Sequence, residues 1–367
     1  MIRLAQVIDR FKADLLQSYT LSEEQQRALT ATQFCRSSAS PKMLAECTAC
    51  DHRAVIPHSC GHRHCPHCQH HQSQQWLERQ MQRLVPAEYF LITYTLPAEF
   101  RALAKAHSTI VFDLLMRCGW DTLQYLSQRD RQLGGTPGAI AVLHTHTRAL
   151  DYHPHAHWVV PAATITERGS ARQWRTKALG KRRYLFHHKA LAKIFRAKFL
   201  AGLRALGLIL PPRYPKDWVV DCKAVGRGEK ALIYLGRYLY RGVIREDDIL
   251  ACEDGHVRFR YRNGKTGAFQ ERSLPGAQFL MLILQHVLPR GFRRARNFGF
   301  LHPNRKRLLA LLAVVLLFVP PHSAAIKPRP AIRCACCGAA MAITSTRLHR
   351  STTADVLATQ STANSAM

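Results

Sequence analysis

The sequence has few acidic residues for its length. Of its 367 residues only 24 are Asp or Glu, whereas 53 are Lys or Arg, so the formal net charge is +29. So large a positive excess indicates a polyanionic partner, and nucleic acid is the first candidate. A solvated basic surface is the alternative, but it would not require this imbalance, and basic residues recur along the chain rather than in one tail.

The sequence also lacks a long apolar segment and an export signal. Residues 308–319 are apolar, but this run is too short to span a bilayer, so we expect a buried helix there. The opening segment, MIRLAQVIDRFKADLL, is amphipathic and carries charges where a signal peptide needs an apolar core. We therefore expect a protein that stays in the cytoplasm and has no membrane partner.

The 12 cysteines are concentrated in two places, with six in residues 35–68 and three in residues 334–337. In a chain that is not exported, Cys-x-x-Cys pairs are typical of metal sites rather than of disulfides. Two such pairs predict one tetrahedral structural zinc site, which would stabilise a segment with little apolar core. The predicted zinc ligands are Cys47, Cys50, Cys65 and Cys68, with Cys60 and His64 as candidates for a second site.

Histidines recur at every second residue in YHPHAHWVV, residues 152–160. Because alternate side chains of a strand face the same side, His155 and His157 would project together and could bind a divalent cation. An antiparallel pairing with the preceding apolar segment would bring His144 or His146 to this face as a third ligand. A polar strand with incidental histidines is the alternative, since the chain has 20 His.

Residues 229–245 have the apolar spacing of an amphipathic helix. Tyr234 and Tyr238 lie four residues apart and would share one face, whereas Tyr240 would point to nearly the opposite side. Two tyrosines one turn apart, beside arginines, could be paired nucleophiles for phosphodiester bonds. Half-buried core tyrosines are the alternative.

The other segments predict an α+β chain. Asn263-Gly264 indicates a hairpin turn, Ser22 an N-cap, and residues 162–183 a polar connection. The end of the chain is rich in Ser, Thr and Ala and is expected to be disordered. Helices are expected in residues 1–34, 69–83, 100–127, 186–207 and 279–286, and strands in residues 89–96, 139–147, 153–160, 218–225, 257–261 and 268–273.

These motifs together resemble the transposases of the insertion sequence 91 family, which belong to the HUH class of single-strand nucleases. The resemblance is carried by SCGHRHCPHCQ (59–69), VLHTHTRALDYHPHAHWVVP (142–161), YLGRYLYRGVI (234–244) and FLMLILQHVLPRGFRRARNFGFL (279–301). The family has a Gly-Gly-His element where this chain has SSASPKMLAE, so Cys35 is not assigned as a ligand. Cys334 and Cys337 resemble the remnant of a further knuckle, for which the sequence offers no partner pair.

The resemblance implies a small N-terminal zinc-binding module plus an HUH-type nuclease core, whose central antiparallel sheet is flanked by helices. The expected divisions are residues 1–85 for the N-terminal helix and zinc module, 86–301 for the core, and 302–367 for a C-terminal helix, Cys-rich remnant and tail.

The resemblance also implies an activity. His155 and His157 would hold Mg²⁺ or Mn²⁺ at the scissile phosphate, and Tyr234 or Tyr238 would attack to give a 5′-phosphotyrosine and a free 3′-hydroxyl. The second tyrosine would serve a second strand transfer, as rolling-circle transposition requires. The expected partner is single-stranded DNA at transposon ends and target, not a small molecule, with Trp158 and Trp174 as stacking residues. The expected DNA-binding residues are Lys223, Arg237, Arg241, Arg290, Arg293 and Arg294.

Three other functions compete with this one. A non-catalytic zinc-dependent DNA-binding protein would also be basic and rich in Cys-x-x-Cys, but it would not need the histidine strand or the tyrosine helix. A metal-dependent nuclease that uses water would leave a free 5′-phosphate and no protein–DNA adduct. A transposase built on three acidic metal ligands would need an acidic cluster, and the few acids form none that is persuasive.

Overall fold

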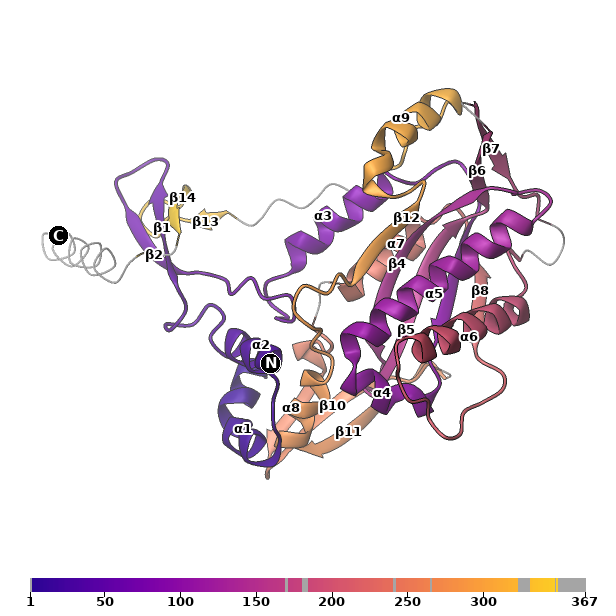
Figure 1. Ribbon diagram of the computed structural model, residues 1–367. Coiled ribbons are helices and arrows are strands. Elements are labelled where there is room, and N and C mark those ends of the chain that lie inside the picture. Colours follow the sequence, from indigo (N-terminus) through magenta and orange to yellow (C-terminus); the bar gives the residue numbers. More distant parts are fainter. Residues whose placement is uncertain are drawn as a thin grey trace, which may run out of the picture.

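The computed structural model of the chain describes residues 2–168, 171–179, 184–239, 242–264, 266–322, 331–346 and 348. The predicted α+β class is confirmed, since an antiparallel sheet with helices on both faces forms the body of the molecule (Figure 1). The tail expected to be disordered lies outside the described residues. Among the helices that are described, none is both long and apolar enough to cross a membrane.

The body is organised around a seven-stranded sheet in the order β7-β6-β4-β5-β3-β8, with β12 also paired to β4. The pairing of β4 with β5 is antiparallel and confirms the predicted hairpin. The expected polar connection at residues 162–183 is wrong in part, because β6 and β7 form a further hairpin at the edge, where Thr164 and Ile165 are buried. The strands are β3 (Tyr89–Thr95), β4 (Thr136–His146), β5 (Tyr152–Pro161), β6 (Ala163–Arg168), β7 (Ala171–Thr176), β8 (Val220–Ala224) and β12 (Ala295–Gly299).

The two faces of this sheet bury different side chains. On β5, Ala156, Trp158 and Val160 point into a core covered by α5 (Ser108–Arg129) and α6 (His188–Ala205). The intervening residues, His155, His157 and Val159, therefore point to the other face, where α3 (His70–Met81) and α7 (Glu229–Leu239) pack. The period-two alternation of one strand thus separates the structural core from the face that carries the histidines.

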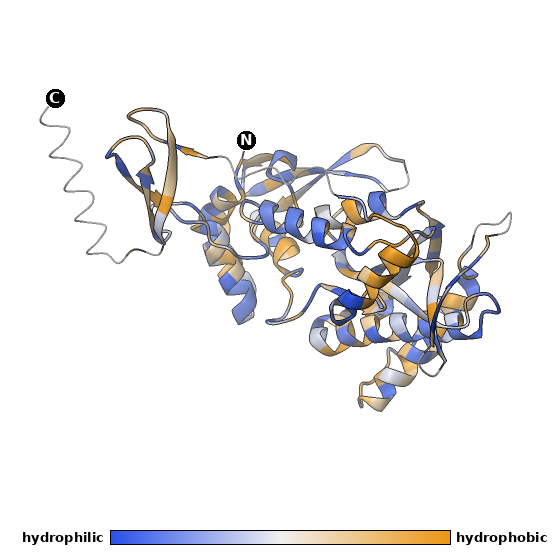
Figure 2. Ribbon diagram, turned by 90° about the horizontal axis from the view of Figure 1, so that it is seen from above, coloured by the Kyte–Doolittle hydropathy of each residue, from blue (hydrophilic) through white to orange (hydrophobic). Residues whose placement is uncertain are grey.

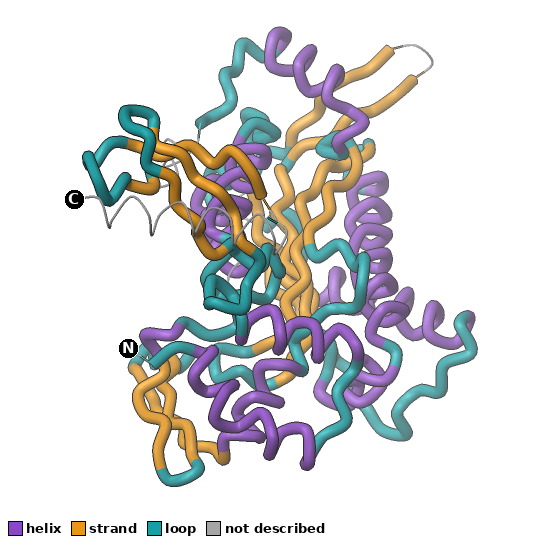
Figure 3. Tube along the Cα trace, turned by 90° about the vertical axis from the view of Figure 1, so that its left-hand side faces the viewer, coloured by secondary structure: helices purple, strands orange, loops and turns teal. Residues whose placement is uncertain are grey.

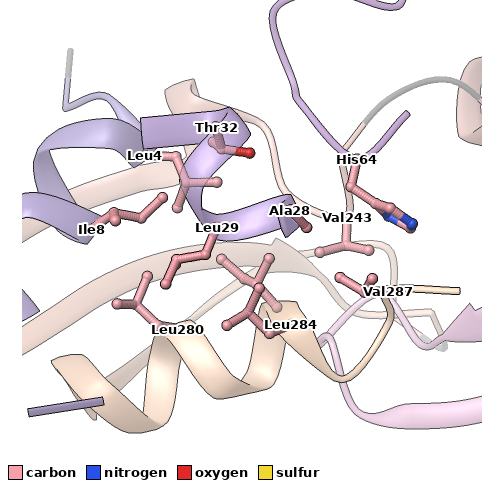
Figure 4. Close-up of a pocket in the computed structure, with 11 residues that line it drawn as sticks. Leu4, Ile8, Ala28, Leu29, Thr32, His64, Val243, Leu280, Leu284 and Val287 are labelled. Atoms are coloured by element: carbon pink, nitrogen blue, oxygen red, sulfur yellow. The ribbon is translucent and has the colours of Figure 1, made fainter. Parts of the chain in front are cut away.

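The N-terminal helices pack against a segment far away in the sequence. Two helices, α1 (Leu4–Ser18) and α2 (Glu23–Gln33), replace the single helical stretch that was expected. The predicted N-cap is confirmed, since the Ser22 hydroxyl accepts from the Gln25 N–H. Both helices bury their apolar faces against α8 (Gly276–Leu284) and the sheet β11-β10-β9 (Figure 4). The predicted hairpin is confirmed, because β10 and β11 pair in antiparallel fashion. The strands of this sheet are β9 (Ile249–Glu253), β10 (His256–Arg262) and β11 (Phe269–Pro275).

A separate four-stranded sheet, in the order β13-β14-β1-β2, joins the two ends of the chain. Figure 1 shows it projecting from the body, with the early strands β1 and β2 beside the late strands β13 and β14, and Figure 2 shows the same projection from above. In Figure 3 this end of the molecule faces the viewer. The bounds are β1 (Lys42–Cys47), β2 (Arg53–Pro57), β13 (Ile332–Arg333) and β14 (Ala340–Thr346).

The expected buried helix at residues 308–319 is only half right. Helix α9 (Lys306–Val315) buries Leu308 and Leu312, but Val314 is 71% exposed, because the helix lies on the surface and covers the core with one face alone. The remaining helices are α4 (Arg101–Ala106) and the 3₁₀ turns Ala98–Phe100, Glu246–Asp248 and Pro303–Arg305.

Candidate active site

Three histidines meet on the face of the central sheet that α7 covers. His155 and His157 alternate along β5, and His144 on β4 is the residue directly opposite His155 in the antiparallel register. One ring nitrogen from each of the three lies within 4.8 Å of the others. The predicted pair therefore lies together, and His144 is the third member. The other candidate, His146, turns instead towards His286, with ring centroids 5.2 Å apart.

Hydrogen bonds orient two of these rings. The His155 Nδ1–H donates to the backbone carbonyl of His153 at 2.7 Å, and His157 Nδ1 lies 2.9 Å from the Thr93 hydroxyl. Each ring thereby keeps Nε2 for a ligand, the usual arrangement of a metal-binding histidine. Burial lowers the pKa of His155 to about 3 and that of His157 to about 4, and burial also lowers the pKa of His144. Three neutral imidazoles so placed fit a divalent cation.

Tyr234 approaches the histidines from α7. The helix buries the predicted apolar stripe, with Leu232, Leu235 and Leu239 all less than 9% exposed, and this fixes which face meets the sheet. Tyr234 is 36% exposed, and its ring centroid lies 6.1 Å from that of His157. The helix is shorter than expected, because residues 242–245 are not helical. The side chain of Tyr238 and the whole of Tyr240 lie outside the described residues.

The histidines and Tyr234 line one large cleft of about 690 Å³. A further wall comes from β10 and β11, which bring Arg260, Tyr261 and Arg262 into the same cleft as the histidines. Phe269 on β11 is 65% exposed at this wall, and the Arg260 guanidinium lies 5.1 Å from its ring centroid. Basic side chains interleaved with accessible aromatic rings are typical of single-strand binding surfaces. This wall was not among the predicted site residues.

Some of the predicted DNA-binding residues are exposed on the surface, whereas another is bonded inside the protein. Arg290 and Arg293 are exposed, as is Lys223, which pairs with Asp221 at 2.9 Å. Arg294 instead faces the protein interior, where its guanidinium donates hydrogen bonds to the backbone carbonyls of Leu143 and Leu239. The Arg237 side chain and Arg241 lie outside the described residues.

One predicted stacking residue cannot meet a base. Trp158 is fully buried in the core beneath α5, because it lies on the face of β5 opposite the histidines. Trp174 is half-buried and packs on Phe300, with ring centroids 5.6 Å apart. Besides Tyr234, the cleft offers Phe269 as an exposed aromatic ring.

The cysteines form two clusters, so the prediction that both N-terminal pairs share one site is wrong. The first cluster joins Cys65 and Cys68 to Cys60 and to Cys35, which had not been assigned. The second joins Cys47 and Cys50 to the C-terminal pair for which the sequence offered no partner, Cys334 and Cys337. His64 belongs to neither cluster, because its Nε2 accepts from the Leu288 N–H at 3.2 Å.

The loop of the first cluster packs against the segment that follows α8 and against the turn that follows α7. Arg63 donates to the carbonyls of Pro289 and Phe292 at 2.9 and 2.7 Å, and His67 pairs with Glu246 at 3.0 Å. Figure 4 shows His64 beside Val243 and Val287, at the edge of the apolar seam formed by α1, α2 and α8. The loop then leads into α3, where the Ser73 hydroxyl donates to the carbonyl of Gly236 in α7 at 2.7 Å.

Comparison with known proteins identifies the family. The family model described as "Putative transposase" matches residues 138–308, and the one described as "Transposase zinc-binding domain" matches residues 7–96. The "Putative transposase y4qJ" of Sinorhizobium fredii is 35% identical over 314 residues, covering 79% of this chain and 77% of that protein. The chain belongs to the insertion sequence 91 family of transposases.

A second relative is also a transposase. The transposase for insertion sequence element IS801 of Pseudomonas savastanoi pv. phaseolicola is 29% identical over 331 residues, covering 81% of this chain and 77% of that protein. The predictions of a transposase and of a structural zinc domain are thereby confirmed. Among solved structures, the conjugative relaxase TrwC in complex with OriT DNA covers 63% of this chain and 73% of that chain, at 17% identity and a TM-score of 0.25.

The candidate site contains residues that were not predicted from the sequence, and for some of them the sequence pattern indicates a place in the site. His144 could have been chosen over His146 from the antiparallel register alone, because it is the residue that falls opposite His155. Arg260 lies between Phe259 and Tyr261 on a predicted strand, but its local sequence does not show that this strand lines the cleft with the histidines. The place of this strand in the site depends on how α8 and the N-terminal helices dock.

Proposed function

We propose that this transposase nicks and rejoins single-stranded DNA through a 5′-phosphotyrosine, with Tyr234 as the first nucleophile, in rolling-circle transposition. The observation that carries the proposal is the convergence of Tyr234 and the cluster of His144, His155 and His157 on one face of the central sheet. A zinc-dependent DNA-binding protein without catalysis has no use for this arrangement.

The residues of the site divide the chemistry between them. His144, His155 and His157 would hold Mg²⁺ or Mn²⁺, with imidazole ligands favouring Mn²⁺, and the ion would neutralise charge at the scissile phosphate. The Tyr234 hydroxyl loses its proton and forms an Oη–P bond, while the bond from phosphorus to the 3′ oxygen breaks. That oxygen takes up a proton and leaves as a free 3′-hydroxyl. A phenol is mostly protonated at neutral pH, so the positive charge of the cleft arginines favours the attacking phenolate.

The covalent intermediate makes the reaction reversible without ATP, because the phosphotyrosine bond keeps the energy of the broken phosphodiester. A 3′-hydroxyl, from the same strand or from another, attacks the phosphorus and releases Tyr234. Tyr238 lies one turn along the same helix, where it serves a second strand while Tyr234 is occupied.

Single-stranded DNA at the transposon ends and target would enter the cleft between α7 and the wall of β10 and β11. Phosphates meet Arg148, Arg260 and Arg262, and a base stacks on Phe269. This activity belongs to the core of residues 86–301 and takes place at the nucleoid, in the bacterial cytoplasm. The zinc of the matched domain would be held by Cys35, Cys60, Cys65 and Cys68. The Sγ atom of Cys68 lies 3.1, 3.5 and 3.6 Å from those of Cys35, Cys60 and Cys65.

Incubation with short single-stranded oligonucleotides and Mn²⁺, followed by denaturing electrophoresis, tests the proposal. The wild-type protein should give a protein–DNA adduct that resists denaturation. Replacing His155 and His157 with Ala should abolish the adduct but spare most DNA affinity, because affinity depends mainly on contacts to phosphates. Cleavage that leaves a free 5′-phosphate and no adduct would support a nuclease that uses water, and binding without cleavage would support a non-catalytic protein.

A further inference from the structure

The second cysteine cluster has the geometry of a metal site built from the two ends of the chain. The Sγ atoms of Cys47 and Cys337 lie 3.4 Å apart, those of Cys50 and Cys334 lie 3.7 Å apart, and all four fall within 4.8 Å. Four sulfurs bound at about 2.3 Å around a tetrahedral zinc lie about 3.8 Å from one another. A disulfide would bring two of them to about 2.0 Å. We propose that these cysteines hold a second structural zinc ion, which fastens the C-terminal segment to the N-terminal one.

The backbone around each pair is folded as a knuckle that supports a thiolate. The N–H of Ala49 points at Cys47 Sγ at 3.3 Å, and the N–H of Cys336 points at Cys334 Sγ at 3.4 Å. Such N–H groups stabilise the negative charge that a cysteine carries when it binds zinc. Gly338 closes the C-terminal turn with φ +73, a conformation that favours glycine, and donates to the Cys334 carbonyl at 3.0 Å.

The pairing of β1 with β14 brings the two knuckles together, but the sheet has only a small apolar core to stabilise this arrangement. β1 pairs with β14 in a register that places Cys47 opposite Met341, and the Thr48 hydroxyl donates to the Ala340 carbonyl at 2.9 Å. The apolar core of this sheet has only Ala45, Cys334 and Met341 fully buried among the described residues. So small a core cannot offset the entropy of ordering two distant segments, whereas a structural zinc contributes folding energy directly.

The proposed ion is distinct from the zinc of the matched domain. The family model for that domain ends at residue 96, so it includes the N-terminal pair and leaves out both C-terminal ligands. The first cluster already has four sulfurs without them. The chain therefore holds two zinc ions, one within the N-terminal domain and one shared between the chain ends.

Metal analysis of the purified full-length protein in a non-thiol reductant tests the proposal. We expect two zinc ions per chain in the wild type and one in a double variant, Cys334→Ser with Cys337→Ser. The matched control is Cys336→Ser, which changes an exposed cysteine between the two ligands that belongs to neither cluster and should keep two ions. A wild-type chain with one ion, or a double variant that keeps two, would overturn the proposal.

Two further measurements guard against a general loss of folding. All five tryptophans lie outside the four-stranded sheet, at positions 76, 120, 158, 174 and 218, so their fluorescence reports unfolding of the body alone. The double variant should unfold with the wild-type midpoint by this signal. Hydrogen exchange should meanwhile accelerate across residues 42–57, because β1 loses β14 as its partner. Unchanged exchange in these residues would contradict a metal-dependent attachment.

Discussion

Each of the two cysteine clusters offers four thiolate ligands, but the two clusters differ in what surrounds them. The loop of Cys60, Cys65 and Cys68 makes hydrogen bonds to the segment that follows α8, and it leads into α3, whose Ser73 hydroxyl donates to the Gly236 carbonyl in α7. The cluster of Cys47 and Cys337 belongs to the small sheet of β1, β2, β13 and β14, which projects from the body (Figure 1). On the proposed function, the first cluster supports the helix that carries Tyr234, whereas the second joins the N- and C-terminal segments outside the cleft.

The largest expected effect comes from breaking the first cluster. Cys65 is fully buried, and Cys65→Ser should release one zinc and loosen the loop that supports α7. A displacement of about 1 Å in a nucleophile can cost about a hundred-fold in rate, so adduct formation should fall by at least that factor. The measurement is adduct yield over time beside zinc content. Wild-type cleavage by a variant that has lost this ion would separate the cluster from the active site.

A smaller effect is expected from the contact between that loop and the core. Arg63→Ala removes two hydrogen bonds to the carbonyls of Pro289 and Phe292, which should lower the free energy of unfolding by roughly 1–3 kcal/mol. Arg27→Ala is the matched control, because this arginine lies on α2 in the body of the molecule and pairs with Glu23 on the surface. Denaturant unfolding followed by tryptophan fluorescence compares the two. Equal destabilisation would show that the contact of this loop with the core contributes no more than a surface ion pair.

The smallest effect on cleavage is expected from breaking the second cluster. As far as the structure describes the chain, the lining of the cleft includes no residue of the four-stranded sheet. The double variant of Cys334 and Cys337 should therefore cleave a short oligonucleotide within about two-fold of the wild-type rate, since surface changes away from a site usually have small effects. A loss comparable to that of Cys65→Ser would erase the distinction between the clusters.

The sequence predicts the parts of the site that depend on local periodicity. Alternation within a strand places His155 and His157 on one face, and helical spacing places Tyr234 beside an apolar stripe. The pairing of the cysteines could not be predicted in the same way, because every Cys-x-x-Cys pair has the same local chemistry. Only the docking of β14 on β1 shows that Cys47 and Cys50 meet the C-terminal pair.

Tertiary packing also explains the errors about aromatic and basic residues. Trp158 was expected to stack on bases, but the same alternation that exposes the histidines to the cleft turns its ring into the core. Arg294 was expected at the DNA, yet its backbone position beside β4 sets its donors against internal carbonyls. Composition indicates how many basic residues there are, whereas sheet register decides which of them face the cleft.

The most direct test of the account is to locate the covalent bond to DNA. Trypsin separates the candidates, because cleavage after Arg237 places Tyr234 in ALIYLGR and Tyr238 with Tyr240 in YLYR. After nuclease trimming of the adduct, mass spectrometry should find the nucleotide on Tyr234 in single-strand cleavage. Tyr234→Phe should remove that linkage, whereas Tyr125→Phe, at an exposed tyrosine on α5, should leave it intact. A nucleotide linked to Tyr240, or to a peptide outside α7, would contradict the account.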